Sequence, residues 1–122
     1  MTTTTAQGPV FRRGTVALVL FPNSSRRSAK TRPALVIQRD DLESGLPQLI
    51  IRMITSRIFR ANHASRVGIS LNSPEGKQSG LLSDSVVMTD NIATIESLAI
   101  ERAVGTLPMP AIDDALRHTF AV

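Results

Sequence analysis

The sequence contains no cysteine, no tryptophan and no tyrosine, and only two histidines. The absence of cysteine excludes disulfides, thiolate metal sites and cysteine nucleophiles, and it fits a reducing compartment. Without tryptophan or tyrosine, the core must be built from Val, Ile, Leu, Ala, Met and four phenylalanines, which favours a small β-rich protein. An acid–base mechanism with two histidines would require a loop and a helix to bring His63 and His118 together, and we do not expect it.

Long apolar segments are absent too. Runs such as residues 16–21 are far shorter than the ~20 residues that cross a bilayer, and residues 1–9 lack the basic and apolar parts of a secretory signal. We therefore expect a cytoplasmic protein without membrane association. A chain of 122 residues is long enough for one domain and too short for two ordinary ones, so we expect a flexible tail over residues 1–10 and a single domain over residues 11–122.

Charge is distributed unevenly along the chain. Residues 12–66 hold eleven Arg or Lys against three acids, a net charge of +8, whereas residues 67–122 hold three against seven, a net charge of −4. Twelve of the fourteen cations are arginines, whose planar guanidinium suits phosphate and carboxylate groups. We expect an anionic partner, and nucleic acid is favoured over a merely solvated basic face.

Apolar, β-branched runs and the turn residues between them predict a β-rich fold. Strands are predicted over residues 15–21, 34–39, 48–54, 66–71, 80–88, 92–95 and 98–107. Loops or turns are predicted over residues 22–31, 40–47 and 72–76, with a loop or short strand over residues 57–65. Many short strands of this kind indicate a barrel or a sandwich.

One helix is predicted over residues 110–120. Pro110 lies near its first turn, Asp113 and Asp114 are early and Arg117 and His118 late, as the helix dipole favours. The residues spaced to pack one face on the sheet are Ile112, Leu116 and Phe120, with Ala115 and Thr119 beside them.

The junction of the first two strands carries the clearest functional signal. Residues 22–31 are polar and basic, as in surface loops that carry function. Pro33 has a fixed φ and pushes Arg32 towards an extended conformation, so we expect Arg32 to leave this loop in a defined direction where the strand begins. A guanidinium oriented in this way can hold an oxyanion with two hydrogen bonds. Alternatively, Arg32 pins a loop or pairs with a carboxylate.

Four segments share their order and spacing with one known family. They are residues 13–16 (RGTV), residues 31–38 (TRPALVIQ), residues 54–56 (ITS), and residues 80–87 (GLLSDSVV) with residues 92–95 (IATI). Over residues 12–120 the chain resembles the MazF/PemK (Kis/Kid-type) toxins, which are small, ribosome-independent endoribonucleases. The resemblance implies a mainly β fold with a C-terminal helix, an SH3-like antiparallel barrel of the MazF/PemK/CcdB type.

The resemblance also implies an activity and its partners. In this family a homodimer holds single-stranded RNA in its groove, and cleavage is sequence-specific. The ribose 2′-OH attacks the adjacent phosphate without a metal or cofactor. A cognate MazE-like antitoxin neutralises the toxin, and its acidic or apolar extended segment would cover the basic groove.

Matching positions make Arg32 and Thr55 the catalytic candidates. Arg32 would neutralise charge that develops on the phosphate, and Thr55 would fix the 2′-OH or a phosphate oxygen by a hydrogen bond. Neither residue accounts for the general base. The substrate-binding candidates are Arg26, Arg27, Ser28, Lys30, Ser56, Arg57, Arg60 and Ser85. Thr55 and Ser56 are alternatively simple strand-ending hydroxyls, and Asp84 with Ser85 a turn or cap pair.

Two departures from the family pattern keep a second function open. Residues 25–28 (SRRS) stand where many members carry a Gly-Ser-Glu-Gln-like run, and Thr15 stands where an acid is common. The first departure puts the general base in doubt and strengthens phosphate attraction. The alternative is a non-catalytic nucleic-acid-binding module, or a CcdB-like toxin that poisons a topoisomerase; the ending of residues 119–122 (TFAV) counts against CcdB, which relies on an aromatic-glycine-aliphatic end.

Aromatic residues that could stack on RNA bases are few. The candidates are Phe11, Phe21 and Phe59, and each of them could belong to the core.

Overall fold

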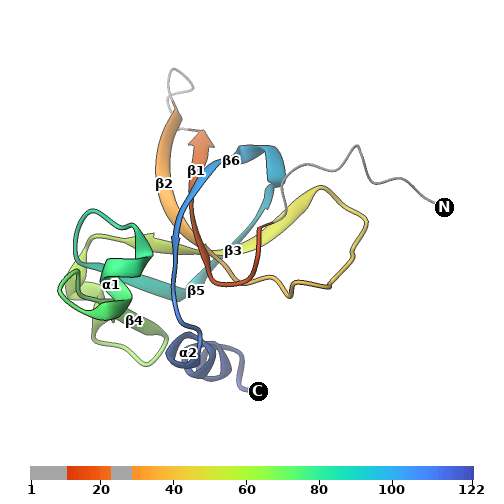
Figure 1. The fold of residues 1–122 in the computed structure, drawn as a ribbon. Coiled ribbons are helices and arrows are strands. Elements are labelled where there is room, and N and C mark those ends of the chain that lie inside the picture. The colour runs from red at the N-terminus through yellow and green to blue at the C-terminus, as the bar shows by residue number, and fades with distance from the viewer. Residues whose placement is uncertain (1–10, 23–28) are drawn as a thin grey trace.

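The strands form one strongly curved antiparallel sheet in the computed structural model, which describes residues 11–22 and 29–122 (Figure 1). The strands lie in the order β4-β5-β3-β2-β1-β6. Their bounds are Thr15–Pro22 (β1), Ala29–Val36 (β2), Gln48–Thr55 (β3), Arg66–Ile69 (β4), Ser85–Glu96 (β5) and Ile100–Thr106 (β6). The predicted mainly β fold with a C-terminal helix is confirmed, although β4 and β6 are free edges of the described sheet, so the barrel is not closed. The tail expected over residues 1–10 lies outside the described residues.

The helical elements are short. They are η1 (Ile58–Ala61), α1 (Pro74–Ser79), η2 (Ser97–Ala99) and α2 (Pro110–Phe120). Helix α2 has the predicted bounds, and of its predicted packing residues Ile112, Ala115 and Leu116 are buried whereas Phe120 is 52% exposed. None of the helices in the described ranges is long and apolar enough to cross a membrane.

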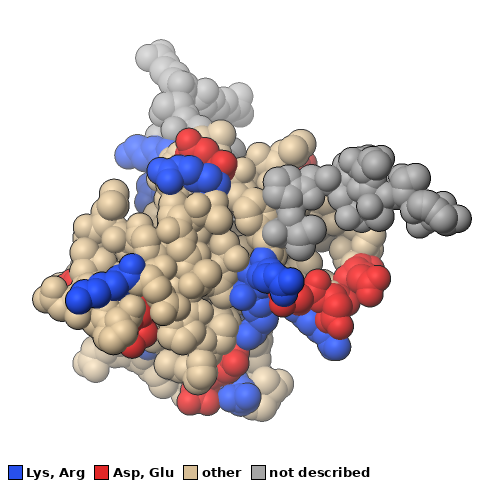
Figure 2. All heavy atoms as spheres, in the orientation of Figure 1, with Lys and Arg blue, Asp and Glu red and all other residues tan. Residues whose placement is uncertain are grey.

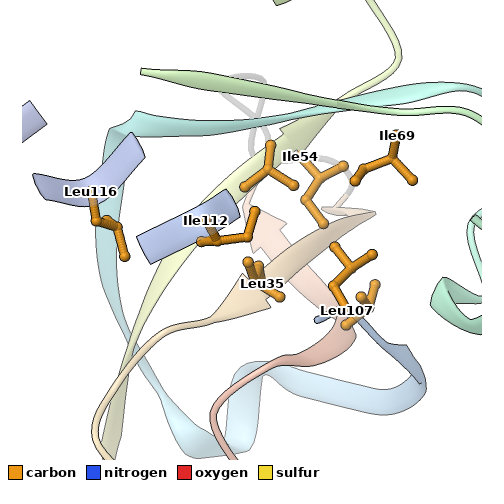
Figure 3. Close-up of a cluster of buried hydrophobic side chains, with 8 residues drawn as sticks. Leu35, Ile54, Ile69, Leu107, Ile112 and Leu116 are labelled. Carbon is orange, nitrogen blue, oxygen red and sulfur yellow. The ribbon is translucent and has the colours of Figure 1, made fainter. Parts of the chain in front are cut away.

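The side chains of the strands point alternately to the two faces of the sheet, and they form two buried apolar clusters. Leu35 belongs to one cluster and its neighbours Ala34 and Val36 to the other, because successive side chains of a strand point to opposite faces. The first cluster also includes Ile112 and Leu116, and Figure 3 shows these α2 side chains beside residues of the sheet. The terminal helix therefore covers one face of the sheet, as its apolar spacing predicted.

Two segments that were predicted as turn and loop are helical. Residues 72–76 begin α1 instead of forming a simple turn, because the Ser73 side chain accepts a hydrogen bond from the Gly76 backbone N–H (3.0 Å) and Pro74 supplies a first helical residue. Residues 57–65 contain η1, and residues 98–107 divide into η2 and β6.

The strands around the centre of the chain also differ from the prediction. β2 begins at Ala29, five residues earlier than predicted, and ends at Val36, because its first half pairs along β1. The predicted strands over residues 80–88 and 92–95 are one strand, β5, which begins at Ser85. Residues 89–91 bulge from β5 between the pairs Met53–Met88 and Arg52–Ile92.

Arg52 fills this bulge and is fully buried. Its Nε donates to the Thr89 carbonyl oxygen (2.7 Å), and its guanidinium lies 5.1 Å from the centroid of the Phe120 ring. Desolvation by burial lowers the pKa of Arg52. Arg52 therefore connects the bulge to α2 and is not available to a ligand, although it belongs to the basic half of the chain, residues 12–66.

Candidate active site

A cleft of about 770 Å³ opens where β2 separates from β3. These strands pair only from Ala34–Met53 to Val36–Ile51, so the first half of β2 runs beside β1 alone. Residues 80–83, between α1 and β5, form another part of the wall. The polar lining residues are Thr31, Arg32, Thr55, Ser56, Arg57, Arg60, Ser83, Ser85 and Asn91. The lining contributed by the described residues contains no carboxylate and no histidine.

The register of β2 and β3 brings Arg32 and Thr55 together. Ala34 pairs with Met53, and two residues further along each strand lie Arg32 and Thr55. Since side chains two apart share a face of a strand, Arg32 and Thr55 project from the same side of the sheet where the two strands part. Both line the cleft.

Arg32 lies inside β2, and the prediction that it stands at the start of this strand was wrong. It pairs with Val19 of β1. Proline has no backbone N–H and is found mainly where a strand lacks a neighbour on one side. Pro33 is tolerated within β2 because this half of the strand pairs with β1 but not with β3. The Arg32 side chain is exposed and forms no ion pair with another described residue.

Thr55 ends β3, and its hydroxyl also stabilises the turn that follows. Its Oγ1 accepts a hydrogen bond from the backbone N–H of Arg57 (3.2 Å), a common turn at Ser and Thr. A hydroxyl has one hydrogen and two lone pairs, so this bond leaves the hydrogen available to an acceptor in the cleft. Thr55 is thus a strand-ending hydroxyl and a potential hydrogen-bond donor to a ligand.

Arg57 and Arg60 reach the cleft from the segment that contains η1. This segment is attached to the bulge of β5 through Arg66, whose Nη1 donates to the Arg60 carbonyl oxygen (3.2 Å). Arg66 also donates to both carboxylate oxygens of Asp90 (3.1 and 2.6 Å). We therefore regard Arg66 and Asp90 as residues that position η1.

The ion pair of Arg66 and Asp90 predicts a pH-dependent contribution to stability. The hydrogen bond from Arg66 lowers the pKa of Asp90 from its ordinary value of 3.8. A carboxyl whose pKa is lower in the folded state stabilises that state above the ordinary pKa, and the contribution is lost as the pH falls through the lowered pKa. We expect Asp90→Asn to reduce the free energy of unfolding at neutral pH, measured by urea denaturation, and this deficit to shrink in acid.

Asp114→Asn provides the control, because Asp114 pairs with Arg117 on the exposed surface of α2. This variant should differ little from the parent at any pH. A deficit for Asp90→Asn that is the same at every pH would contradict the pKa shift as its cause.

Arginines outside the cleft are mostly paired with aspartates. The pairs are Arg12–Asp40, Arg13–Asp113, Arg39–Asp41, Arg66–Asp90 and Arg117–Asp114. On the face in Figure 2, most basic side chains lie beside acidic ones. Arg32, Arg57 and Arg60 form no such pair with described residues, and outside the cleft neither do the buried Arg52 and the exposed Lys30, Lys77 and Arg102. The cleft therefore gathers three positive charges that no aspartate or glutamate of the described residues compensates.

The remaining site candidates fall into two groups. Ser56 and Ser85 line the cleft, and the Ser85 Oγ donates to the Ser83 carbonyl oxygen (2.9 Å). Lys30 is exposed on β2 and does not line the cleft. Arg26, Arg27 and Ser28 lie outside the described residues. Asp84 has the structural role considered for it, since its carboxylate accepts a hydrogen bond from the Leu71 backbone N–H (2.8 Å).

Several residues of the cleft wall were not predicted from the sequence. Asn91 reaches the cleft from the bulge of β5, which no residue pattern indicated. Ser83 and the leucines before it line the cleft just after α1, which is capped by Gly80, a glycine with φ +73°. A left-handed glycine often caps the end of a helix. If residues 74–79 had been predicted as a helix, Gly80 would have indicated its end and a change of chain direction there.

The two histidines are closer than expected. The ring centroids of His63 and His118 are 6.2 Å apart, and His63 Nδ1 accepts a hydrogen bond from the Ser65 backbone N–H (3.0 Å). The loop and the helix therefore do bring the two histidines together, which is the geometry that an acid–base mechanism with two histidines would require. Neither histidine lines the cleft, so their proximity supplies no acid or base to the arginines there.

Solved MazF structures share this fold. The Mycobacterium tuberculosis toxin MazF-mt6 is 23% identical with a TM-score of 0.69, over 88% of this chain and 97% of the other. An endoribonuclease in complex with its cognate antitoxin, from a mycobacterial species, is 18% identical with a TM-score of 0.68, over 94% and 97% of the two chains. MazE-MazF from Deinococcus radiodurans gives 16% identity and a TM-score of 0.69, over 94% and 99%.

The sequence itself matches a family model over most of its length. The model describes the PemK-like, MazF-like toxin of type II toxin-antitoxin systems, and it matches residues 12–120. That span contains all the described strands and helices and the segments on which the resemblance was based. The chain belongs to the PemK-like, MazF-like family of type II toxins.

Proposed function

We propose that this protein is an endoribonuclease toxin that cleaves single-stranded RNA at specific sequences, independently of the ribosome. The observation that carries the proposal is the cleft, whose lining combines three arginines without carboxylate partners among the described residues with the hydroxyl of Thr55. Family membership supports the same activity, since solved structures of this fold are named endoribonucleases.

The proposed reaction uses a nucleophile of the substrate. The ribose 2′-oxygen forms a bond to the adjacent phosphorus, the bond from phosphorus to the 5′-oxygen breaks, and the products are a 2′,3′-cyclic phosphate and a 5′-OH. The Arg32 guanidinium would donate to phosphate oxygens as negative charge develops on them, and Thr55 would add a further hydrogen bond. Arg57 and Arg60 would hold neighbouring phosphates.

Stabilisation of charge is the main catalytic contribution in this proposal. A guanidinium has a pKa above ~12 and is a poor general base. The described lining holds no carboxylate or imidazole that could accept the proton of the 2′-OH. We therefore propose that Arg32 and Thr55 stabilise the transition state and that neither of them is the general base.

We also propose that the protein acts in the cytoplasm as a homodimer and is inhibited by a cognate MazE-like antitoxin. Structures of this fold include one in complex with a cognate antitoxin and one with MazE. The positive charge of the cleft fits an acidic extended segment, and Leu82, which lines it and is 97% exposed, fits an apolar residue of such a segment.

The product ends of a cleavage reaction test this function. We expect purified protein to cut a long single-stranded RNA at discrete positions in EDTA and to leave 5′-OH ends. Thr55→Ala should lose most of this activity because the hydrogen-bond donor is gone, whereas Thr55→Ser should retain much of it. Cleavage that requires an added metal, or that is equal in Thr55→Ala, would contradict the proposed mechanism.

A non-catalytic RNA-binding module is the second candidate. The absence of a carboxylate or histidine from the described lining of the cleft is the observation that favours it. This protein would bind intact RNA with a steep dependence on salt, since binding would rest on phosphate contacts, and no cyclic phosphate would form.

A further inference from the structure

Phe59 is an exposed aromatic residue beside the arginine cleft. Its side chain is 75% exposed, although phenylalanine is among the residues most often buried. It lies in η1, which has no buried residue, between Arg57 and Arg60 of the cleft lining. Among the other stacking candidates, Phe11 packs against the second core cluster, and the Phe21 side chain is outside the described part. Phe59 therefore is not a core residue.

The ring of Phe59 contacts an arginine whose backbone is fixed by a neighbouring ion pair. The Arg60 guanidinium lies over it, 5.8 Å from the ring centroid. The backbone of Arg60 is in turn fixed by Arg66, which pairs with Asp90 in the bulge of β5. A segment whose backbone is fixed before binding loses less conformational freedom when a ligand contacts it.

We propose that Phe59 is a stacking platform for one base of the bound RNA, next to the nucleotide whose phosphate meets Arg32. Proteins that bind single-stranded nucleic acid combine cations along the backbone with aromatic rings on which bases stack. Arg57 and Arg60 supply the cations on either side of Phe59 in the chain. The proposal rests on RNA as the ligand of the proposed function, but it does not require cleavage.

The charges favour RNA over a protein contact at this place. Ile58 is also exposed, and an apolar pair of this kind would suit a partner protein or a second copy of the chain. However, Phe59 lies between two arginines that form no ion pair with described residues, and a phosphodiester backbone compensates both charges while its bases remain free to stack.

Fluorescence of a base analogue tests the platform directly. The probe is an oligouridylate with 2′-fluoro sugars, which block cleavage, and with one 2-aminopurine in its centre. Stacking on a ring quenches this fluorophore, whereas uridines stack weakly. We expect quenching with the parent protein and with Phe59→Tyr, which keeps the ring. Phe59→Leu, which keeps the apolar contact, should lose the quenching, and Phe59→Ala should also bind at least about fivefold more weakly.

Leu98→Ala is the matched control, because Leu98 is 92% exposed and does not line the cleft. It should change neither quenching nor affinity. Unchanged quenching and affinity in Phe59→Ala would overturn the proposal, as would an effect of Phe59→Ala confined to the oligomeric state in sedimentation. If quenching depends on Phe59 while the protein cuts no RNA, the platform stands and the proposed cleavage fails. If the parent protein cuts RNA and Phe59→Ala binds and quenches the probe like the parent, the proposed cleavage stands and the platform fails.

Discussion

Replacement of Arg32 by alanine is expected to slow RNA cleavage by about 10²–10³-fold, the usual effect of removing one group that stabilises charge in a transition state. Arg32 lines the cleft beside Thr55 and forms no ion pair with another described residue. Its side chain is exposed, so its removal leaves no cavity in the core. The expected result is therefore a folded protein with an unchanged melting temperature and a much lower rate of cleavage of a defined RNA.

Arg32→Lys distinguishes the contribution of the positive charge from that of the planar guanidinium. Lysine retains the positive charge but cannot offer two parallel hydrogen bonds to a phosphate, so we expect a rate between those of the parent and the alanine variant. Arg102→Ala is the control for net charge, since Arg102 is exposed on β6 and outside the cleft. Equal rates for Arg32→Ala and Arg102→Ala would remove Arg32 from the proposed mechanism.

Gly80→Ala is expected to destabilise the fold by roughly 2–5 kcal/mol, the sum of left-handed strain and overpacking. Gly80 has φ +73°, and a Cβ atom there would lie 2.1 Å from the Val104 carbonyl oxygen of β6. The end of α1 and strand β6 approach each other closely at a second glycine too, since a Cβ on Gly105 would lie 2.4 Å from the Gln78 carbonyl oxygen. The end of α1 would have to move away from β6. We expect a melting temperature lower by roughly 10 °C or more.

Gly45→Ala isolates the conformational part of this cost. Gly45 has a similar φ of +77°, but no atom lies within 4 Å of a Cβ placed there. This variant should lose only about 1–2 kcal/mol, the strain of a left-handed residue. Because residues 80–83 line the cleft, Gly80→Ala should also weaken RNA binding at temperatures where the protein remains folded. Equal losses of stability in the two variants would show that the approach to β6 is unimportant.

The sequence by itself determined the features that depend on local pattern. Helix α2 has the predicted bounds because Pro110, Asp113 and the cations of its last turn act within a few residues of each helix end. The first and third strands were predicted nearly to the residue, since their apolar runs are continuous. The pairing of Arg32 with Thr55 in one site was inferred from the resemblance of short motifs, without knowledge of the register that brings them to the same side of the sheet.

Only the tertiary structure decided which arginines are available to a ligand. Arg52 and Arg32 are both arginines of the basic half, but Arg52 is buried in the bulge of β5 and Arg32 lies where β2 and β3 part. The bulge, the contribution of Asn91 and the proximity of His63 to His118 also follow from contacts between distant segments. Strand register and burial are set by packing across the whole sheet, which makes the environment of a side chain a property of the fold and not of its neighbours in the chain.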